Sequence, residues 1–290
     1  AHDDQRSFNI DTPRNEVPDS LDAEMIDDAR PVFERREKMQ LTYTVRNTHR
    51  AVGTRFSAEI TAKYGMSTLN EDHVHIRLRG SAGQSLGAFL CQGITLEVFG
   101  DSNDYVGKGL CGGKIVVRPM VSSPLVSQDN TIIGNTVLYG ATAGQLYAAG
   151  QAGERFAVRN SGADVVVEGC GANGCEYMTG GNAVILGPVG SNFGAGMTGG
   201  MAFILDTDNN FEKMANGESI VWQRLDSSYW EAHLHQLVER HHQTTDSKWS
   251  EAILRDWDRW RDRFWQVCPK EMVSRIDHPL SDKEVIEAAE

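Results

Sequence analysis

The sequence contains no run of 18 or more apolar residues, and its first ten residues have no apolar core. Neither a membrane-spanning helix nor a secretory signal peptide is therefore predicted. Basic side chains are also scarce, because 28 Lys and Arg residues face 40 Asp and Glu residues and the net charge is -12. This deficit argues against a nucleic-acid partner, since phosphate binding needs a basic field. We expect a soluble, cytoplasmic protein that binds neither membranes nor nucleic acid.

Cysteine is rare as well, and its number is odd. The chain has no Asn-x-Ser/Thr sequon, and its five cysteines are Cys91, Cys111, Cys170, Cys175 and Cys268. Disulfide frameworks are typical of small secreted domains that are dense in cysteine. We therefore expect reduced thiols.

Charged residues are nearly missing from the middle of the chain, and glycine is concentrated there instead. Only 13 of the Asp, Glu, Lys and Arg residues lie between residues 80 and 200, whereas 26 of the 29 glycines do. On this basis we divide the chain into a linker or tether, an N-terminal extension with helices, a Gly-rich block and a C-terminal helical segment, at residues 1–20, 21–72, 73–206 and 207–290.

The segments that flank the Gly-rich block carry helical patterns. Val52, Phe56 and Ile60 recur every four residues, which predicts an amphipathic helix packed on the block. Near the C-terminus, apolar residues at helical spacing predict a helical pair over 227–242 and 249–264. Such a pair could cap a repetitive domain or dock on a partner.

Short motifs repeat inside the Gly-rich block. A Gly-Gly pair precedes a strand-like run in residues 110–117, 178–185 and 197–204. An octet with small residues at its first, fourth and eighth places starts at Gly80, Ala141 and Gly187. The glycines ahead of strand-like runs are 19 to 21 residues apart, except for one step of nine, and lie at positions 93, 113, 134, 153, 162, 181 and 200.

A period near 20 residues is too short for a βαβ unit and fits one coil of a β-solenoid. Tight corners between strands require glycine, and stacked like charges on neighbouring coils would repel one another. We therefore predict a mainly β protein: a single-stranded right-handed parallel β-helix over residues 73–206, with an N-terminal α/β extension and a C-terminal helical pair.

Three Gly-x-Gly-x-x-Gly triplets suggest a dinucleotide site at first sight; they begin at Gly107, Gly169 and Gly194. Such a site needs a strand before the triplet and a helix that opens at its third glycine. The first and third triplets lead straight into strand-like runs, so no helix dipole would face a phosphate. We predict that these glycines do not bind a cofactor.

Cysteine spacing gives a weak metal signal. Cys170 and Cys175 form a Cys-x4-Cys pair, while Cys91 and Cys111 are 20 residues apart, which is one period of the repeat. A metal site usually begins with a closer pair and needs further thiols nearby. A stack of small, half-buried thiols on successive coils is the better interpretation.

Two sets of His and Glu residues have spacings that a metal could use. His73 and His75 alternate on one strand, and Glu231, His235 and Glu239 step by four along one helix face. Nothing completes a tetrahedral set, so we interpret both as ordinary polar faces. The charge run 34–38 is interpreted in the same way.

The sequence also shows no motif for nucleophilic catalysis. The chain has no Gly-x-Ser-x-Gly elbow, and no Ser or Cys has a His and an acid at a known family spacing. We predict no catalytic, cofactor-binding or metal-binding residue, which favours a scaffolding or interface role.

Longer strings resemble one known family. The likeness runs through essentially the whole chain, and the strings that carry it lie at residues 14–18, 80–89, 100–110, 130–141, 150–162, 176–181 and 264–272. In these strings the chain is similar to the C-terminal, GXGXG-type domain of the large (alpha) subunit of bacterial NADPH-dependent glutamate synthase.

The resemblance implies a multidomain enzyme that makes two L-glutamate from L-glutamine and 2-oxoglutarate. In that family an amidotransferase domain releases ammonia, which passes through a tunnel to an FMN-bearing barrel with an iron-sulfur cluster, and NADPH acts through a small (beta) subunit. None of those catalytic parts matches this chain. The resemblance therefore implies a structural domain, inactive by itself, that packs against the amidotransferase and FMN domains and fixes their geometry.

Two alternatives stay open. The chain could be a separate β-helix subunit that binds a partner oxidoreductase, as in formylmethanofuran dehydrogenase, rather than a fragment of a larger chain. A glycine-rich cofactor site would instead bind FMN or NADPH saturably. The first residue is Ala rather than Met, and it does not decide between fragment and subunit.

Overall fold

The computed structural model describes residues 19–283. The predicted tether falls almost entirely on residues 1–18, outside the described residues, as do residues 284–290. The helices and strands are, in chain order, α1 Leu21–Asp28, α2 Arg30–Arg35, β1 Met39–Val45, α3 Thr54–Tyr64, β2 Val74–Ala82, β3 Ile94–Ser102, β4 Cys111–Arg118, β5 Thr131–Ile133, β6 Ala143–Ala148, β7 Gln151–Ala152, β8 Ser161–Val167, β9 Thr179–Ile185, β10 Gly199–Leu205, α4 Phe211–Met214, β11 Ile220–Arg224, α5 Ser228–Thr245, α6 Lys248–Arg255, α7 Trp257–Arg261 and β12 Phe264–Pro269.

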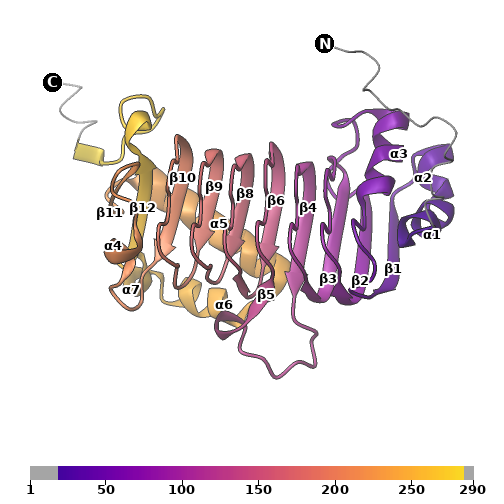
Figure 1. The fold of residues 1–290 in the computed structure, drawn as a ribbon, viewed down its shortest axis with the longest axis horizontal. Coiled ribbons are helices and arrows are strands. Elements are labelled where there is room, and N and C mark those ends of the chain that lie inside the picture. Colours follow the sequence, from indigo (N-terminus) through magenta and orange to yellow (C-terminus); the bar gives the residue numbers. More distant parts are fainter. Residues whose placement is uncertain (1–18, 284–290) are drawn as a thin grey trace, which may run out of the picture.

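One 12-stranded sheet runs along the longest axis of the molecule (Figure 1). Its main order, β1-β2-β3-β4-β6-β8-β9-β10, follows the chain, and all neighbours in that series are parallel. At the far end β12 pairs with β10 and β11 pairs with β12, both antiparallel. The prediction of a mainly β protein with parallel strands is confirmed.

The connections between the parallel strands are themselves hydrogen-bonded to one another. Ser102 at the end of β3 pairs with Ile133 of β5, and β5 pairs with β7. Isolated bridges extend this second line from Ala152 to Cys170 and from Cys170 to Val189. The chain therefore builds a second, shorter ladder of parallel contacts beside the main one.

Each connection then turns through a segment in which every second residue has a left-handed backbone. In the first turn these residues are Ser85, Gly87 and Phe89, with φ of 66°, 65° and 55°. Their N–H groups donate alternately to the next and the previous turn, at Asp104, Val52 and Lys108. The same alternation starts again at residues 105, 136, 155, 173 and 192, so this corner repeats with the strands.

The irregular step of nine in the glycine period has a structural cause. The regularly spaced glycines belong to two different sets of positions, one next to the short strands β5 and β7 and one in or beside the main strands. Gly134 follows β5 and Gly153 follows β7, on the line of short pairs, whereas Gly162 lies in β8 on the main line. Ala163, the residue after Gly162, shares the register position of Gly113 in β4, Gly181 in β9 and Gly200 in β10, since each directly precedes a residue of the paired row Lys114, Asp164, Asn182 and Met201.

The repeated octet proves to be two equivalent segments and one coincidence. The octets that start at Gly80 and Gly187 both end at the middle left-handed position of a turn, with φ of 65° at Gly87 and 74° at Gly194. The octet that starts at Ala141 ends instead in Ala148, the last residue of β6. Small residues are required at both places, so composition alone could not separate them.

A continuous aliphatic row fills the inner side of the sheet. Its members lie on one register line, so that each packs on its equivalent from the neighbouring strands. All are buried in one hydrophobic cluster: Ile76, Leu96, Ile115, Leu146, Val165 and Ala183.

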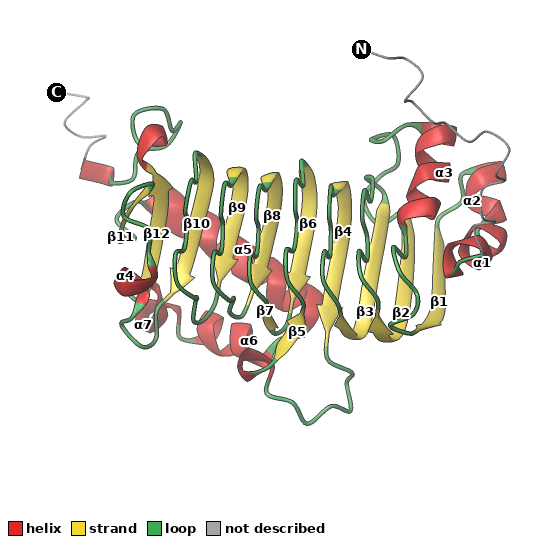
Figure 2. Cartoon of the chain, viewed as in Figure 1, coloured by secondary structure: helices red, strands yellow, loops and turns green. Residues whose placement is uncertain are grey.

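Part of the opposite side of the sheet is covered by α5 (Figure 2). Leu234, Leu237 and Val238 of this helix form a second buried cluster with strand residues. Those strand residues also lie on one register line: Tyr147, Val166, Val184 and Phe203. Within residues 19–283, no helix combines the length and the apolarity that a membrane span would require.

The flanks differ from the sequence prediction at three points. β1, placed in the N-terminal extension, is the first strand of the sheet and pairs with β2 along its whole length. The second helix of the predicted C-terminal pair is divided at Asp256 into α6 and α7. Phe264, expected on that helix, begins β12, because the strand gains a hydrogen-bonding partner in β10 that no local pattern reveals.

Candidate functional site

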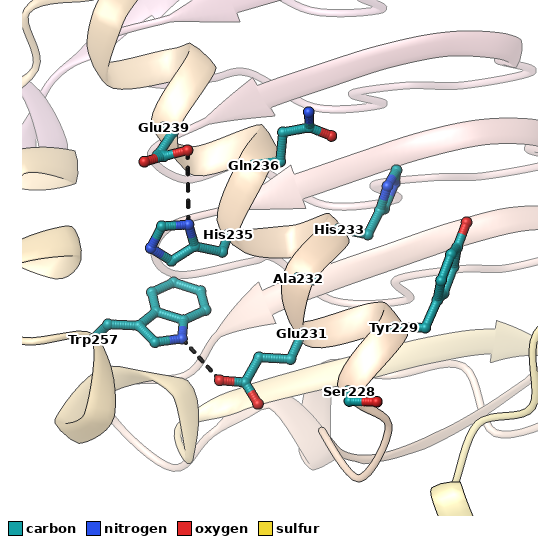
Figure 3. A pocket seen from close by; sticks show the side chains of 9 residues that line it. All are labelled: Ser228, Tyr229, Glu231, Ala232, His233, His235, Gln236, Glu239 and Trp257. Atoms are coloured by element: carbon teal, nitrogen blue, oxygen red, sulfur yellow. Dashed lines mark hydrogen bonds and ion pairs between the residues drawn. The ribbon is translucent and has the colours of Figure 1, made fainter.

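A cavity of about 890 Å³ lies along the polar face of α5. Figure 3 shows three of its side chains at four-residue spacing, Glu231, His235 and Glu239. The Glu231 carboxylate accepts hydrogen bonds from Trp257 Nε1 (3.0 Å) and Arg261 Nη1 (3.2 Å). His235 Nδ1 lies 3.8 Å from Glu239 Oε2. The Glu231 contacts fasten α7 to α5, whereas His235 and Glu239 pair within α5, as expected for a polar helix face.

His73 and His75, the other predicted polar face, have different environments. His73 precedes β2 and is buried, so the interpretation as a polar face is wrong for this residue. His75 Nε2 lies 3.0 Å from Glu97 Oε2, which also accepts a hydrogen bond from Arg77 Nε at 3.1 Å. Across residues 19–283, no cluster of three or more His, Cys, Asp or Glu side chains is placed to hold a metal ion.

The Glu97 contacts make stability depend on pH. Burial opposes ionisation of this carboxyl group, but the hydrogen bonds and charges of His75 and Arg77 outweigh it and lower its pKa below 4.5. A lowered folded-state pKa adds stability above the unfolded-state value, and this stability is lost as the pH falls through the folded-state value.

Glu97→Gln is therefore expected to reduce the free energy of unfolding by about 1 to 2 kcal/mol at neutral pH. The difference from wild type should shrink as the pH falls below 4.5. Urea unfolding between pH 7 and pH 3 measures this, with Glu239→Gln on the exposed face of α5 as the control. Parallel pH profiles for wild type and Glu97→Gln would contradict the assignment.

Four of the five cysteines are buried, more completely than the half-buried thiols that the sequence predicts. All five are free thiols, and Cys111 is the one that is partly accessible. Burial raises the pKa of Cys170 to about 12 and that of Cys175 well above its usual value. Nucleophilic or metal-binding chemistry requires the thiolate, which burial of this kind disfavours.

Two of the three glycine triplets share a structural role. Gly107 and Gly109, and likewise Gly194 and Gly196, have positive φ and occupy the second and third left-handed positions of a turn. Their triplets lead into β4 and β10, as predicted. The triplet at Gly169 lies after β8 instead and contributes no left-handed residue. The glycines are thus backbone corners.

The charge run 34–38 closes α2 at the surface. Arg36 caps the helix with a left-handed backbone (φ 55°), and Arg35 Nε pairs with Glu37 Oε1 at 2.7 Å with both side chains exposed. This agrees with the interpretation of the run as a solvated face.

A buried polar cluster was missed by sequence reasoning. Glu168 follows β8, His241 lies on α5, and both are fully buried. Glu168 Oε1 lies 3.3 Å from His241 Nε2 and also accepts a hydrogen bond from the Ser247 hydroxyl. The residues are 73 and 79 positions apart in the chain, so no spacing signal could have found them.

The cluster contains a Ser, a His and an acid, but its arrangement differs from that of a hydrolase triad. The Ser247 hydroxyl donates to the carboxylate, whereas a nucleophile must donate to the imidazole that activates it. Ser247 Oγ also accepts from the Ser250 N–H and thereby caps α6. The cluster therefore joins α5 and α6 to the sheet.

Comparison with known proteins identifies relatives along most of the chain. The sequence model of the GXGXG motif family matches residues 22–270. The chain is similar to the "Glutamate synthase [NADPH] large chain" of Azospirillum brasilense, with 62% identity over 275 residues, and to that of Bacillus subtilis, with 44% identity over 285 residues. It is also 45% identical over 248 residues to the chloroplastic ferredoxin-dependent glutamate synthase of Spinacia oleracea.

These matches cover nearly all of this chain but little of the relatives. They span 95% of the chain and 18% of the Azospirillum protein, 95% and 19% for the Bacillus protein, and 86% and 15% for the spinach protein. The chain thus spans less than one-fifth of the length of the relatives it matches.

Proposed function

The chain belongs to the GXGXG motif family, and on that premise we propose that it is the C-terminal, non-catalytic scaffold domain of a cytoplasmic glutamate synthase. We infer that residues 73–206 form a right-handed parallel β-helix. Support comes from the two ladders of parallel contacts and from the left-handed corner that recurs in step with them.

The observation that carries the scaffold role is this interlocking of the backbone. Neighbouring repeats are hydrogen-bonded along the main strands, along the short strands and across the left-handed turns. A body bonded along three lines resists bending, because any hinge would break several backbone hydrogen bonds at once. Such a body suits a spacer between other domains.

The proposed partners are the amidotransferase and FMN domains of the same large chain, with the small subunit reached through the whole enzyme. FMN, the iron-sulfur cluster and NADPH would act outside this chain. Ammonia transfer between two active sites requires a fixed relative geometry, since small misplacements of reacting groups lower the rate strongly. The rigid domain would maintain that geometry.

Loosening the scaffold should uncouple the two reactions of the full enzyme. In the full-length large chain with its small subunit, Gly199→Ala introduces a Cβ 2.1 Å from the backbone oxygen of Thr179 on the neighbouring strand. We expect more ammonia released into solution per NADPH oxidised, measured below the unfolding transition. Gly140→Ala, whose Cβ meets nothing within 4 Å, should stay coupled. Unchanged stoichiometry in Gly199→Ala would refute the scaffold role.

A further inference from the structure

The outer side of the sheet is covered over part of its length. α5 packs on β6, β8 and β9 and reaches β4, where its capping residue Asp246 pairs with Arg118 Nη2 at 2.8 Å. Figure 2 shows α5 behind the sheet, ending before β3. Under α5, the outward residues of neighbouring strands are apolar, as at Tyr147 of β6. The residues that align with them on β1, β2 and β3 are polar or charged, namely Thr42, Arg77 and Glu97.

A cavity of about 470 Å³ opens on the uncovered part. It lies between β2, β3 and the loop that follows β4, and we call it the β2–β3 cavity. It is lined by Arg77, Arg79, Phe99, Met120, Val121 and Ser122.

The loop at this cavity holds large apolar side chains in solvent. Val121 is 85% exposed, and Met120, Leu125 and Val126 are 44%, 57% and 50% exposed. Scattered apolar residues are common on surfaces, but four within seven residues of one loop form a patch typical of an interaction site. The loop projects from the edge of the sheet in Figure 1.

The arginines of the cavity are not equally paired. Arg77 contacts Glu97. No carboxylate among residues 19–283 forms an ion pair or hydrogen bond with Arg79, which is exposed. Arg79 of β2 pairs with Phe99 of β3, and Phe99 pairs on its other side with Arg118 of β4. The two arginines thus occupy matching positions on either side of Phe99, but only Arg118 has an aspartate partner, Asp246, among residues 19–283. The cavity thus offers a positive charge, that of Arg79, next to the exposed apolar loop.

We propose that the β2–β3 cavity and its loop are the docking site of another segment of the same large chain, one that presents a carboxylate next to an apolar side chain. The occupant would repeat the pattern that α5 shows at the other half of the face, where apolar residues cover the strands and an aspartate holds an arginine. Since the chain spans 15 to 19% of its relatives, most of the large chain is available to supply that segment. A second copy is less suitable, because each copy carries a net charge of -12. The proposal rests on the proposed function.

Thiol labelling in the full-length large chain tests this directly. Val121→Cys places a thiol where Val121 is 85% exposed, and a maleimide reacts with it while mass spectrometry follows the peptide that contains position 121. The same protein in denaturant gives the unprotected rate. We expect labelling of the native chain to be slower by about tenfold or more, since protection requires a closed state that opens rarely.

Charge reversal identifies the contact. Adding Arg79→Glu should return labelling toward the unprotected rate, whereas Arg275→Glu, an exposed arginine at the other end of the molecule, should leave the protection in place. Labelling of the native chain at the unprotected rate overturns the proposal. Protection that disappears on dilution, together with a change in mass by light scattering, means a second copy and also overturns it.

The outcome is separable from the scaffold test. Protected labelling in an enzyme whose stoichiometry does not respond to Gly199→Ala would support the docking site and refute the scaffold role. Unprotected labelling in an enzyme that does respond would refute the docking site alone.

Discussion

Gly199→Ala is expected to lower the free energy of unfolding of the chain by about 3 kcal/mol or more. Gly199 of β10 pairs with Thr179 of β9, and a Cβ at this position would lie 2.1 Å from the Thr179 oxygen and 2.7 Å from its carbonyl carbon. Both are backbone atoms of a hydrogen-bonded strand, so they cannot move aside as a flexible side chain would. The two strands must separate locally.

The matched control separates crowding from backbone strain. Gly140 has a positive φ of 67° but open space around its missing Cβ. Equivalent positions in other turns hold Phe89, Arg159 and Tyr177 with φ of 53° to 55°. Gly140→Ala should therefore cost about 1 kcal/mol, measured with Gly199→Ala by urea unfolding. Equal losses for the two variants would mean that close strand approach is not what demands glycine here.

Glu168→Ala should be the second large effect, about 3 kcal/mol, because it removes the acceptor of two buried groups. His241 Nε2 and the Ser247 hydroxyl both contact Glu168 Oε1, in a region closed to solvent. Without the carboxylate, the contact between the α5–α6 segment and β8 loses its polar centre. We expect the loss in urea unfolding, with the near-ultraviolet signal of the tryptophans around α6 changing first.

Two further variants test the physical cause. Glu251→Ala removes an exposed ion pair with Lys248 at 3.2 Å and should cost less than about 0.5 kcal/mol. Replacing both buried partners, Glu168→Leu with His241→Leu, should restore part of the stability, since a paired replacement leaves no orphaned polar group. A double variant less stable than Glu168→Ala would show that packing, rather than the unpaired groups, dominates.

The repeat illustrates how far local patterns reach. The Gly-Gly pairs correctly mark β4, β9 and β10, but they lie within the first residues of these strands rather than ahead of them. Glycine is needed there because the backbone of the neighbouring strand approaches closely. The assignment of all regular glycines to one line was wrong. Gly153 and Gly162 are nine residues apart because one follows a short strand and the other lies in a main strand, and both places demand small residues.

The C-terminal segment shows the opposite limit. The apolar spacing from Tyr229 to Val238 predicts α5 correctly, since one face of that helix packs on the sheet. The same reasoning extended a helix to Phe264, where β12 begins. A short run rich in aromatic residues suits either structure, and the open edge of β10 decided for the strand.

The sequence by itself determined the mainly β class and the parallel repeat, because these follow from composition and from contacts between residues close to one period apart. It also carried the family resemblance, in its longer strings. The tertiary structure decided what joins distant positions, such as Glu168 with His241 and Asp246 with Arg118. It also placed Arg79 beside an exposed loop with no carboxylate partner among residues 19–283. The reason is physical, since a helix that crosses many strands contacts residues at separations that no repeat period encodes. Those long-range contacts determine which part of the sheet α5 covers and which part it leaves uncovered.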